Sequence, residues 1–276
     1  MKSIQELQDI ARRVRVNLLR SIHGAGGGHT GGSLSSVDIL TTLFFRTMRY
    51  SPLEKLPDRD RFILSKGHSA EGFYAVLAEA GFIALEELWN YGTFGAMLYG
   101  HPTPKVPGVE VPTGALGHGL SVGVGMAIAA QRDQLPSRVF VLMGDGEQAE
   151  GSVWEAAMSA SHYRLGNLVG IIDHNKLQIS GTVDDVMTIS SLHDRWSSFG
   201  WRVFEVDGNN MEQLVELFDA LPIDENTPIM IVAHTVKGKG VSFIENNPSW
   251  HHKVPSAEEL QRALEELGYQ TAEVNQ

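Results

Sequence analysis

Residues 139–146 read VFVLMGDG, five consecutive apolar residues that end in Gly144-Asp145-Gly146. Residues 168–175, LVGIIDHN, repeat the pattern, because an apolar run again ends in a polar turn, Asp173-His174-Asn175. Continuously apolar runs of this length are typical of strands that are buried on both faces, as in parallel sheets covered by helices. The two stretches therefore predict an α/β fold, a parallel sheet with helices on both faces.

Helix and strand patterns alternate along the rest of the chain. Strands are expected at 61–64, 138–143, 168–173, 202–206 and 229–233, and helices at 4–19, 35–46, 70–80, 85–91, 116–134, 152–163, 193–199, 211–221 and 257–267. The first helix ends in glycine, and Ser35 with Asp38 has the spacing of a capping box that opens the second. No linker, repeat or low-complexity tract interrupts the pattern, so we expect residues 1–276 to form a single domain.

Composition excludes several classes of protein. The chain has 276 residues, no cysteine and a formal net charge of −11. No apolar run approaches the ~20 residues that cross a bilayer, and the acidic balance argues against nucleic acid as a partner. The absence of cysteine excludes disulfides and thiolate chemistry. The first twenty residues do not have the pattern of a secretory signal, so the expected location is the cytoplasm.

Polar residues at the ends of the two apolar strands predict a metal site. Asn175 comes 30 positions after Asp145, one crossover unit, which would bring both to the same edge of neighbouring strands. A carboxylate and an amide oxygen suit Mg²⁺, which commonly also binds phosphates, and Gly146 would let a backbone N–H approach a phosphate. Gly-Asp-Gly alone is also an ordinary turn. Combined with Asn175 after the next strand, it favours a magnesium–diphosphate site.

Two other phosphate-binding motifs fit less well. Gly151 comes two positions late for the dinucleotide fingerprint that Gly144 and Gly146 would begin, and no acidic residue ends the next strand at the required distance. The lysines at 105, 237 and 239 do not stand in a Walker A motif. A dehydrogenase and a P-loop kinase or ATPase are therefore disfavoured.

Four histidines, His29, His68, His101 and His251, each lie in a glycine- or proline-flanked loop. A single loop histidine is more often structural or solvated than catalytic, and only convergence of several would favour a site. No His-x-x-x-His or His-Glu-x-x-His pattern supports a zinc hydrolase. We expect these side chains to transfer protons and to form hydrogen bonds with an oxygen-rich substrate, at the ordinary imidazole pKa of about 6.5.

Taken together, the motifs resemble the amino-terminal, thiamine diphosphate-binding part of transketolases over nearly the whole chain. The resemblance rests on Gly144-Asp145-Gly146 with Asp173-His174-Asn175. It also rests on DRFILSKGH (60–68), GHP (100–102), TGALGHG (113–119) and SWH (249–251). It implies the thiamine diphosphate-binding fold, with thiamine diphosphate and magnesium as cofactors.

Individual roles follow from this resemblance alone. It implies that magnesium is held by Asp145, Asn175 and the backbone carbonyl of Leu177. It implies cofactor contacts for His68, Gly114, Leu116, Gly146, Asn175, Lys237 and His251, with Gly114 and Leu116 at the aminopyrimidine. The substrate-facing histidines of the family correspond to His29, His101 and His251. Glu150 would lie at a subunit contact, beside the glutamate that activates the cofactor.

Length is the main departure from the family's long members, which continue beyond the equivalent of Gln276 into a pyrimidine-binding domain and a third domain. The resemblance therefore implies a split transketolase, with a second subunit that carries those domains in an α2β2-type assembly. This chain alone would be inactive or nearly so, because the activating glutamate belongs to the missing domains. The implied reaction transfers a two-carbon ketol unit from a ketose phosphate to an aldose phosphate.

Two alternatives stay open. A subunit of another thiamine diphosphate enzyme, of the 2-oxoacid dehydrogenase or deoxyxylulose-phosphate synthase type, would share Asp145 and differ in its products, although Ser249-Trp250-His251 favours transketolase. A non-catalytic cofactor-binding subunit would have no need of four proton-carrying histidines beside Asp145 and Asn175.

Overall fold

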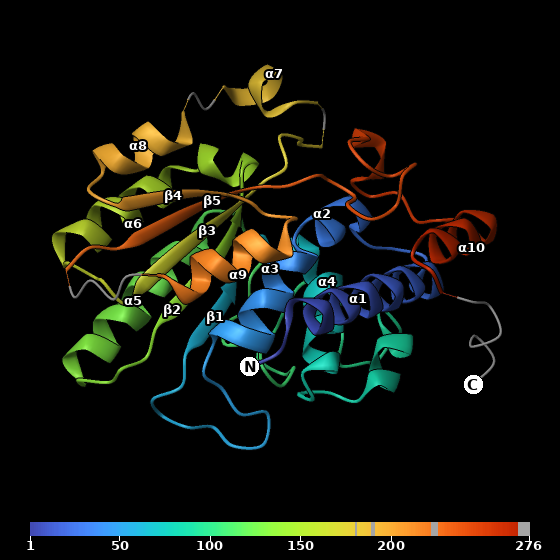
Figure 1. Cartoon of the computed structure of the whole chain (residues 1–276), viewed down its shortest axis with the longest axis horizontal. Helices are drawn as coiled ribbons and strands as arrows, with labels where there is room; N and C mark the ends of the chain where they lie inside the picture. The colour runs from blue at the N-terminus through green and yellow to red at the C-terminus, as the bar shows by residue number, and fades with distance from the viewer. Residues whose placement is uncertain (180, 189–190, 222–225, 270–276) are drawn as a thin grey trace.

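Five parallel strands form one sheet in the order β1-β2-β3-β5-β4. The computed structural model describes residues 1–179, 181–188, 191–221 and 226–269 (Figure 1). The strands are β1 (Arg61–Leu64), β2 (Val139–Gly144), β3 (Leu168–His174), β4 (Arg202–Asp207) and β5 (Ile229–His234). The predicted parallel sheet is confirmed, and each strand end lies within one residue of its predicted position.

Helices cover both faces of this sheet (Figure 1). One face carries α1 (Ile4–Ala25), α3 (Val37–Thr42), α4 (Ala70–Glu79) and α9 (Met211–Asp219). The other carries α5 (His118–Arg132), α6 (Gly151–His162) and α8 (Leu192–Ser198). The remaining helices are α2 (Thr30–Ser35), α7 (Val183–Met187) and α10 (Ala257–Glu266). Short 3₁₀ or π-helical segments occupy 43–47, 67–69, 85–90, 146–149 and 248–250.

Alternate residues of each strand belong to two separate cores. In β2, Phe140 and Leu142 pack on the α1 side, whereas Val141 and Met143 pack on the α5 side. All four side chains are fully buried. Side chains alternate between the two faces of a strand, so a strand apolar at every position must be covered on both sides. The continuous apolar runs were a correct signal for the layered α/β fold.

The segment after α1 differs from its prediction. Helix α1 ends at Gly26, whose φ of +65° is the left-handed conformation that glycine adopts readily. The capping box predicted at Ser35 is wrong, since α2 already begins at Thr30 and Ser35 is buried within it. Ser35 Oγ donates to Asp173 Oδ2 at 2.6 Å, and Asp38 forms a buried ion pair with Arg15 at 2.6 Å. These residues are polar because they have distant buried partners.

Smaller differences concern short elements. Residues 85–90 form the tighter 3₁₀ helix, and α7 was not predicted. Elements of five or six residues offer too few turns for a periodic pattern to be recognised. No helix in the described part of the chain combines the length and apolar character that a membrane crossing requires.

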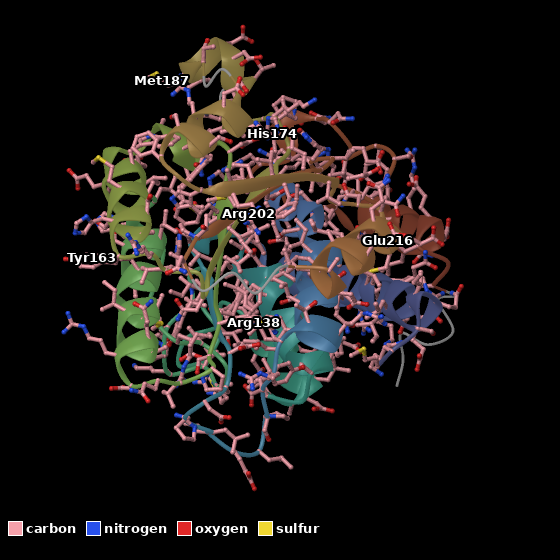
Figure 2. All side chains as sticks on the ribbon, turned by 60° about the vertical axis from the view of Figure 1, so that its left-hand side comes forward. Arg138, Tyr163, His174, Met187, Arg202 and Glu216 are labelled. Atoms are coloured by element: carbon pink, nitrogen blue, oxygen red, sulfur yellow. The ribbon has the colours of Figure 1, made fainter. Side chains whose placement is uncertain are left out.

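The carboxyl ends of the strands form one edge of the sheet. Figure 2 shows His174, at the end of β3, and Arg138, just before β2, at opposite ends of the strands. The register pairs Gly144 of β2 with Asp173 of β3. The residues that follow these two strands therefore lie at the same edge, as predicted.

Candidate active site

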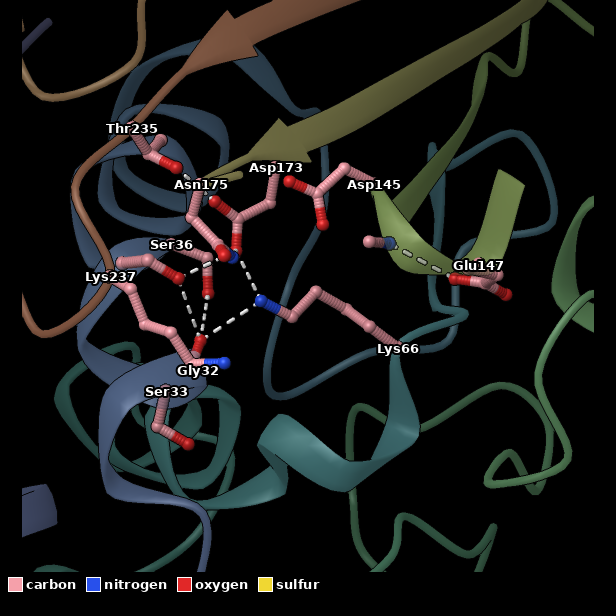
Figure 3. A network of polar contacts seen from close by, with 12 residues as sticks. Gly32, Ser33, Ser36, Lys66, Asp145, Glu147, Asp173, Asn175, Thr235 and Lys237 are labelled. Carbon is pink, nitrogen blue, oxygen red and sulfur yellow. Dashed lines mark hydrogen bonds and ion pairs between the residues drawn. The ribbon is translucent and has the colours of Figure 1, made fainter. Parts of the chain in front are cut away.

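Asp145 and Asn175 lie at this edge and are both buried, with 4% and 7% of their surface exposed. Asp145 Oδ1 accepts the N–H of Gly146 at 2.7 Å, and Oδ2 accepts the N–H of Lys176 at 2.5 Å. Asn175 Oδ1 accepts the N–H of Leu177 at 3.2 Å. Figure 3 shows Asp145 and Asn175 gathered with Asp173 at the strand ends. The geometry brings together the residues that were predicted to hold magnesium.

The electrostatics of Asp145 fit a cation. No ion pair found between described residues includes this carboxyl group, whose hydrogen-bond donors are backbone N–H groups. Burial, with a smaller contribution from the charge of Asp173, raises the pKa of Asp145 to about 6. A buried carboxylate without a basic partner is stabilised by a hard divalent cation. The residues present therefore suit magnesium, and their assignment as ligands stays a prediction.

A buried ion pair between Lys66 and Asp173 lies next to the predicted magnesium ligands (Figure 3). Lys66 and Asp173 are 1% and 0% exposed and form a short contact. Lys66 Nζ also donates to the carbonyl of Gly32 at 2.9 Å, and Asp173 accepts the hydroxyl of Thr235 (Figure 3). Asp173 also accepts the hydroxyl of Ser35. Burial alone would raise the pKa of Asp173, but Lys66 and the two hydroxyls outweigh it and hold that pKa below its ordinary value. Both residues stand within motifs of the sequence, which predicted no role for either.

The four predicted histidines converge around His29. The ring centre of His29 lies 5.3 Å from that of His68, 6.3 Å from His101 and 5.5 Å from His251. A fifth ring, His252, is nearer still at 4.0 Å and was not predicted from the sequence. Its only signal was its position directly after the Ser249-Trp250-His251 motif. We call these five side chains the histidine cluster.

Three members of the histidine cluster are less basic than expected. Burial is the main cause that lowers the pKa of His29 to about 4, of His68 to about 2 and of His251 to about 3. Neighbouring imidazoles and the charges of Lys66 and Lys237 lower these values further. The expectation of an ordinary imidazole pKa is wrong for these three residues. At neutral pH they are uncharged, so each ring offers one hydrogen-bond donor and one acceptor.

Lys237 connects the histidine cluster to the predicted metal site. Its buried Nζ lies 2.9 Å from His251 Nδ1 and donates to the carbonyl of Leu177 at 3.2 Å. Burial and the charge of Lys66 lower the pKa of Lys237 to about 8. A protonated Lys237 donates to His251 Nδ1, which leaves the His251 proton on Nε2. Lys237, which was predicted to contact the diphosphate, therefore contacts both the histidine cluster and a predicted magnesium ligand.

The predicted aminopyrimidine loop is held by a buried glutamate. Glu147, 2% exposed, accepts the N–H of Gly117 at 2.8 Å and the N–H of Gly144 at 3.0 Å, so it ties this loop to the end of β2. Glu147 was not predicted from the sequence. Gly114 has a φ of +146°, and a Cβ there would approach His101 Cδ2 to 2.7 Å.

Three predicted residues complete the description. Leu116 is half-buried in this loop, and its carbonyl faces the ring of His118. Glu150 is exposed at the N-terminus of α6, where a partner subunit could reach it. The N–H of Gly146, predicted to meet a phosphate, is bonded to Asp145 here. The roles of these three residues stay predictions.

A cleft of about 1000 Å³ opens beyond the carboxyl ends of β3, β4 and β5. Its lining includes Asp145, Asn175 and Leu177 and none of the histidine cluster. The cleft by itself would therefore have indicated only the metal half of the site.

The layered fold, the carboxylate at the sheet edge and the histidine cluster agree with the predicted resemblance to thiamine diphosphate-binding domains. The family model described as "Transketolase, thiamine diphosphate binding domain" matches residues 7–275, and the chain belongs to this family. Among its relatives, an apulose-4-phosphate transketolase subunit of Phocaeicola vulgatus is 48% identical over 265 residues, which cover 96% of this chain and 94% of the relative. A 6-deoxy-6-sulfo-D-fructose transketolase subunit of a Clostridium species is 39% identical over 95% of this chain and 96% of its own length.

Single-chain transketolases are matched only in part. Human transketolase is 40% identical over 96% of this chain, which spans 42% of the human protein. The crystal structure of Campylobacter jejuni transketolase superposes with a TM-score of 0.90 and 28% identity, covering 98% of this chain and 44% of that one. The predicted resemblance and fold class are confirmed. So are thiamine diphosphate as cofactor and the assignment of the chain to a transferase, as one subunit of a transketolase.

Proposed function

We propose that this chain binds thiamine diphosphate and magnesium in a two-subunit transketolase that moves a two-carbon ketol unit from a ketose phosphate to an aldose phosphate. The observation that carries the proposal is the convergence of His29, His68, His101 and His251 beside Lys237. A binding-only subunit has no need of several uncharged imidazoles next to the predicted cofactor residues.

The relatives support a second subunit. Three relatives that match along nearly their whole length are named as transketolase subunits, whereas the chain spans about two fifths of human transketolase. We propose that the partner carries the pyrimidine-binding and third domains and that the assembly is of the α2β2 type. The exposed Glu150 is proposed to lie at their contact. We also propose that magnesium is the second cofactor and that the substrates are sugar phosphates, as expected from the sequence. The same expectations lead us to propose that residues 1–276 form a single domain and that the protein is located in the cytoplasm.

The residues divide the chemistry between them. Bound thiamine diphosphate supplies the carbanion that adds to a ketose carbonyl. Asp145, Asn175 and the Leu177 carbonyl would hold the magnesium, which offsets the diphosphate charge, and Lys237 would meet the diphosphate. Because burial keeps His29 and His251 uncharged, each ring can hold substrate hydroxyls through one hydrogen-bond donor and one acceptor.

The proposal is tested by mixing purified subunits. Transfer from xylulose 5-phosphate to ribose 5-phosphate is measured with thiamine diphosphate and magnesium, using this chain alone and then with the second subunit. We expect activity only in the mixture, because the activating glutamate belongs to the partner. Activity of the chain alone would contradict the split enzyme. A mixture that binds the cofactor and transfers no ketol unit from any sugar phosphate offered would contradict the transketolase assignment.

His101→Ala is expected to lower kcat/KM of the mixture about 10- to 100-fold, because a substrate-facing hydrogen bond is lost. Affinity for thiamine diphosphate should change less than about threefold. The backbone of His101 stays anchored, since its carbonyl accepts the hydroxyl of Tyr74 at 3.0 Å. Steady-state kinetics and a cofactor titration separate the two effects. The control is His162→Ala, an exposed histidine at the end of α6. Loss of cofactor binding in His101→Ala would show that the ring serves the cofactor.

A further inference from the structure

Glu71, a buried side chain of α4, has none of the roles described above. It is 1% exposed. Its carboxyl group accepts the backbone N–H of His29 at 3.1 Å, the hydroxyl of Ser33 at 2.7 Å and the hydroxyl of Tyr91 at 2.7 Å. Burial raises the pKa of this carboxyl group, and the three donors oppose that rise. One carboxyl group therefore joins α4 to the loop that carries His29, to α2 and to the end of the 85–90 turn.

The loop before His29 is shaped around this carboxyl group. Gly28 has a φ of +154°, and a Cβ there would lie only 2.8 Å from Glu71 Oε1. Glycine at this position therefore lets the carboxyl group reach the next N–H. His29 is the N-cap of α2, and Ser33 lies one turn further on. Glu71 thus holds the first turn of α2 at both of its ends.

The position of His29 matters because its ring is at the centre of the histidine cluster. The ring centres of His68, His101, His251 and His252 all lie between 4.0 and 6.3 Å from it. Its Nδ1 is buried and has no hydrogen-bond partner among the described residues. No hydrogen bond at this nitrogen orients the ring, so its orientation depends on the neighbouring rings and on where the backbone is held.

The carboxylate of glutamate suits position 71 better than the amide of glutamine. Three donors converge on the two oxygens of Glu71, and a carboxylate is acceptor-only. An amide at this position would turn an NH₂ group toward at least one of these donors. We propose that Glu71 is a positioning residue, which fixes the backbone of His29 and thereby holds its ring toward the substrate. This rests on the proposed function, in which His29 faces the sugar.

The test is a double-mutant cycle in the two-subunit enzyme. Glu71→Gln is expected to lower kcat/KM about tenfold, with affinity for thiamine diphosphate unchanged within about twofold. In a His29→Ala background the same substitution should change kcat/KM less than about twofold, because no ring is left to position. An equal loss in both backgrounds, or a parallel loss of cofactor affinity, would overturn the proposal.

Two further measurements keep the test decisive. If Glu71→Gln fails to fold, Tyr91→Phe removes one of the three donors and should lower kcat/KM about threefold, again only when His29 is present. Ring resonances of the labelled chain provide a readout that needs no activity. Glu71→Gln, or Tyr91→Phe in its place, should shift those of His29 and leave those of the exposed His162 unchanged. Unmoved His29 signals would refute the positioning role, whereas a wild-type mixture without activity would refute the proposed function instead.

Discussion

Asp145→Ala is expected to abolish magnesium-dependent binding of thiamine diphosphate by the two-subunit enzyme. Asp145 is the one carboxylate among the three predicted magnesium ligands, and no basic side chain was found paired with it in the described residues. Burial, with a smaller contribution from the charge of Asp173, raises its pKa to about 6, as expected for a carboxyl group that lacks an ion-pair partner. Loss of an outer partner of a metal ligand typically costs 10- to 100-fold in affinity, so loss of the ligand itself should exceed about 100-fold.

The measurement is a cofactor titration at several magnesium concentrations, followed calorimetrically. Asp184→Ala is the matched control, because Asp184 is exposed and lines the same cleft as Asp145. We expect the control to bind like the wild type, and Asp145→Ala to bind weakly at every magnesium concentration. Unchanged affinity in Asp145→Ala would remove this residue from the metal shell. Weak binding that more magnesium restores would mean that Asp145 only tunes the affinity of the site.

The elements that the sequence predicted well are those with local signals. The two apolar runs that become β2 and β3 are marked by their own residues, and parallel pairing brings Asp145 and Asn175 to one edge. The edge strand β4 is only partly buried and was found through the alternation of elements. Periodicity and topology together were therefore enough for the sheet and for the predicted metal residues.

What the sequence did not reveal depends on contacts between distant segments. Ser35 has the local spacing of a helix cap, yet its hydroxyl bonds Asp173, 138 positions away. The sequence around Glu71 gives no sign of its role, because its partner His29 lies 42 positions away and meets it only in the folded chain. The pKa values of His29, His68 and His251 are lowered chiefly by burial, which a single sequence does not report. The function could therefore be inferred from the sequence motifs. The buried hydrogen bonds that hold the site residues in place could be identified only from the fold.

Asp173→Asn is expected to lower the free energy of unfolding of the chain by about 3–5 kcal/mol, because it leaves the buried Lys66 ammonium without its ion-pair partner. Both side chains are at most 1% exposed, so water cannot replace the lost partner. The pKa of Asp173 lies below its ordinary value of 3.8. The ionised pair therefore contributes stability above the pKa of the unfolded carboxyl group, and that contribution is lost as pH falls through the lower folded value. At neutral pH the full effect is present.

Denaturant unfolding at pH 7 measures this loss, and Asp9→Asn is the control, since Asp9 pairs with Arg12 on the exposed surface of α1 at 3.5 Å. The control should change the free energy of unfolding by less than about 0.5 kcal/mol. Adding Lys66→Met to Asp173→Asn removes the unpaired charge and should restore part of the stability, because a buried pair is costly mainly when only one partner remains. A double variant no more stable than Asp173→Asn would show that the hydrogen bonds of Asp173 to Ser35 and Thr235, and not the charge of Lys66, hold this part of the fold together.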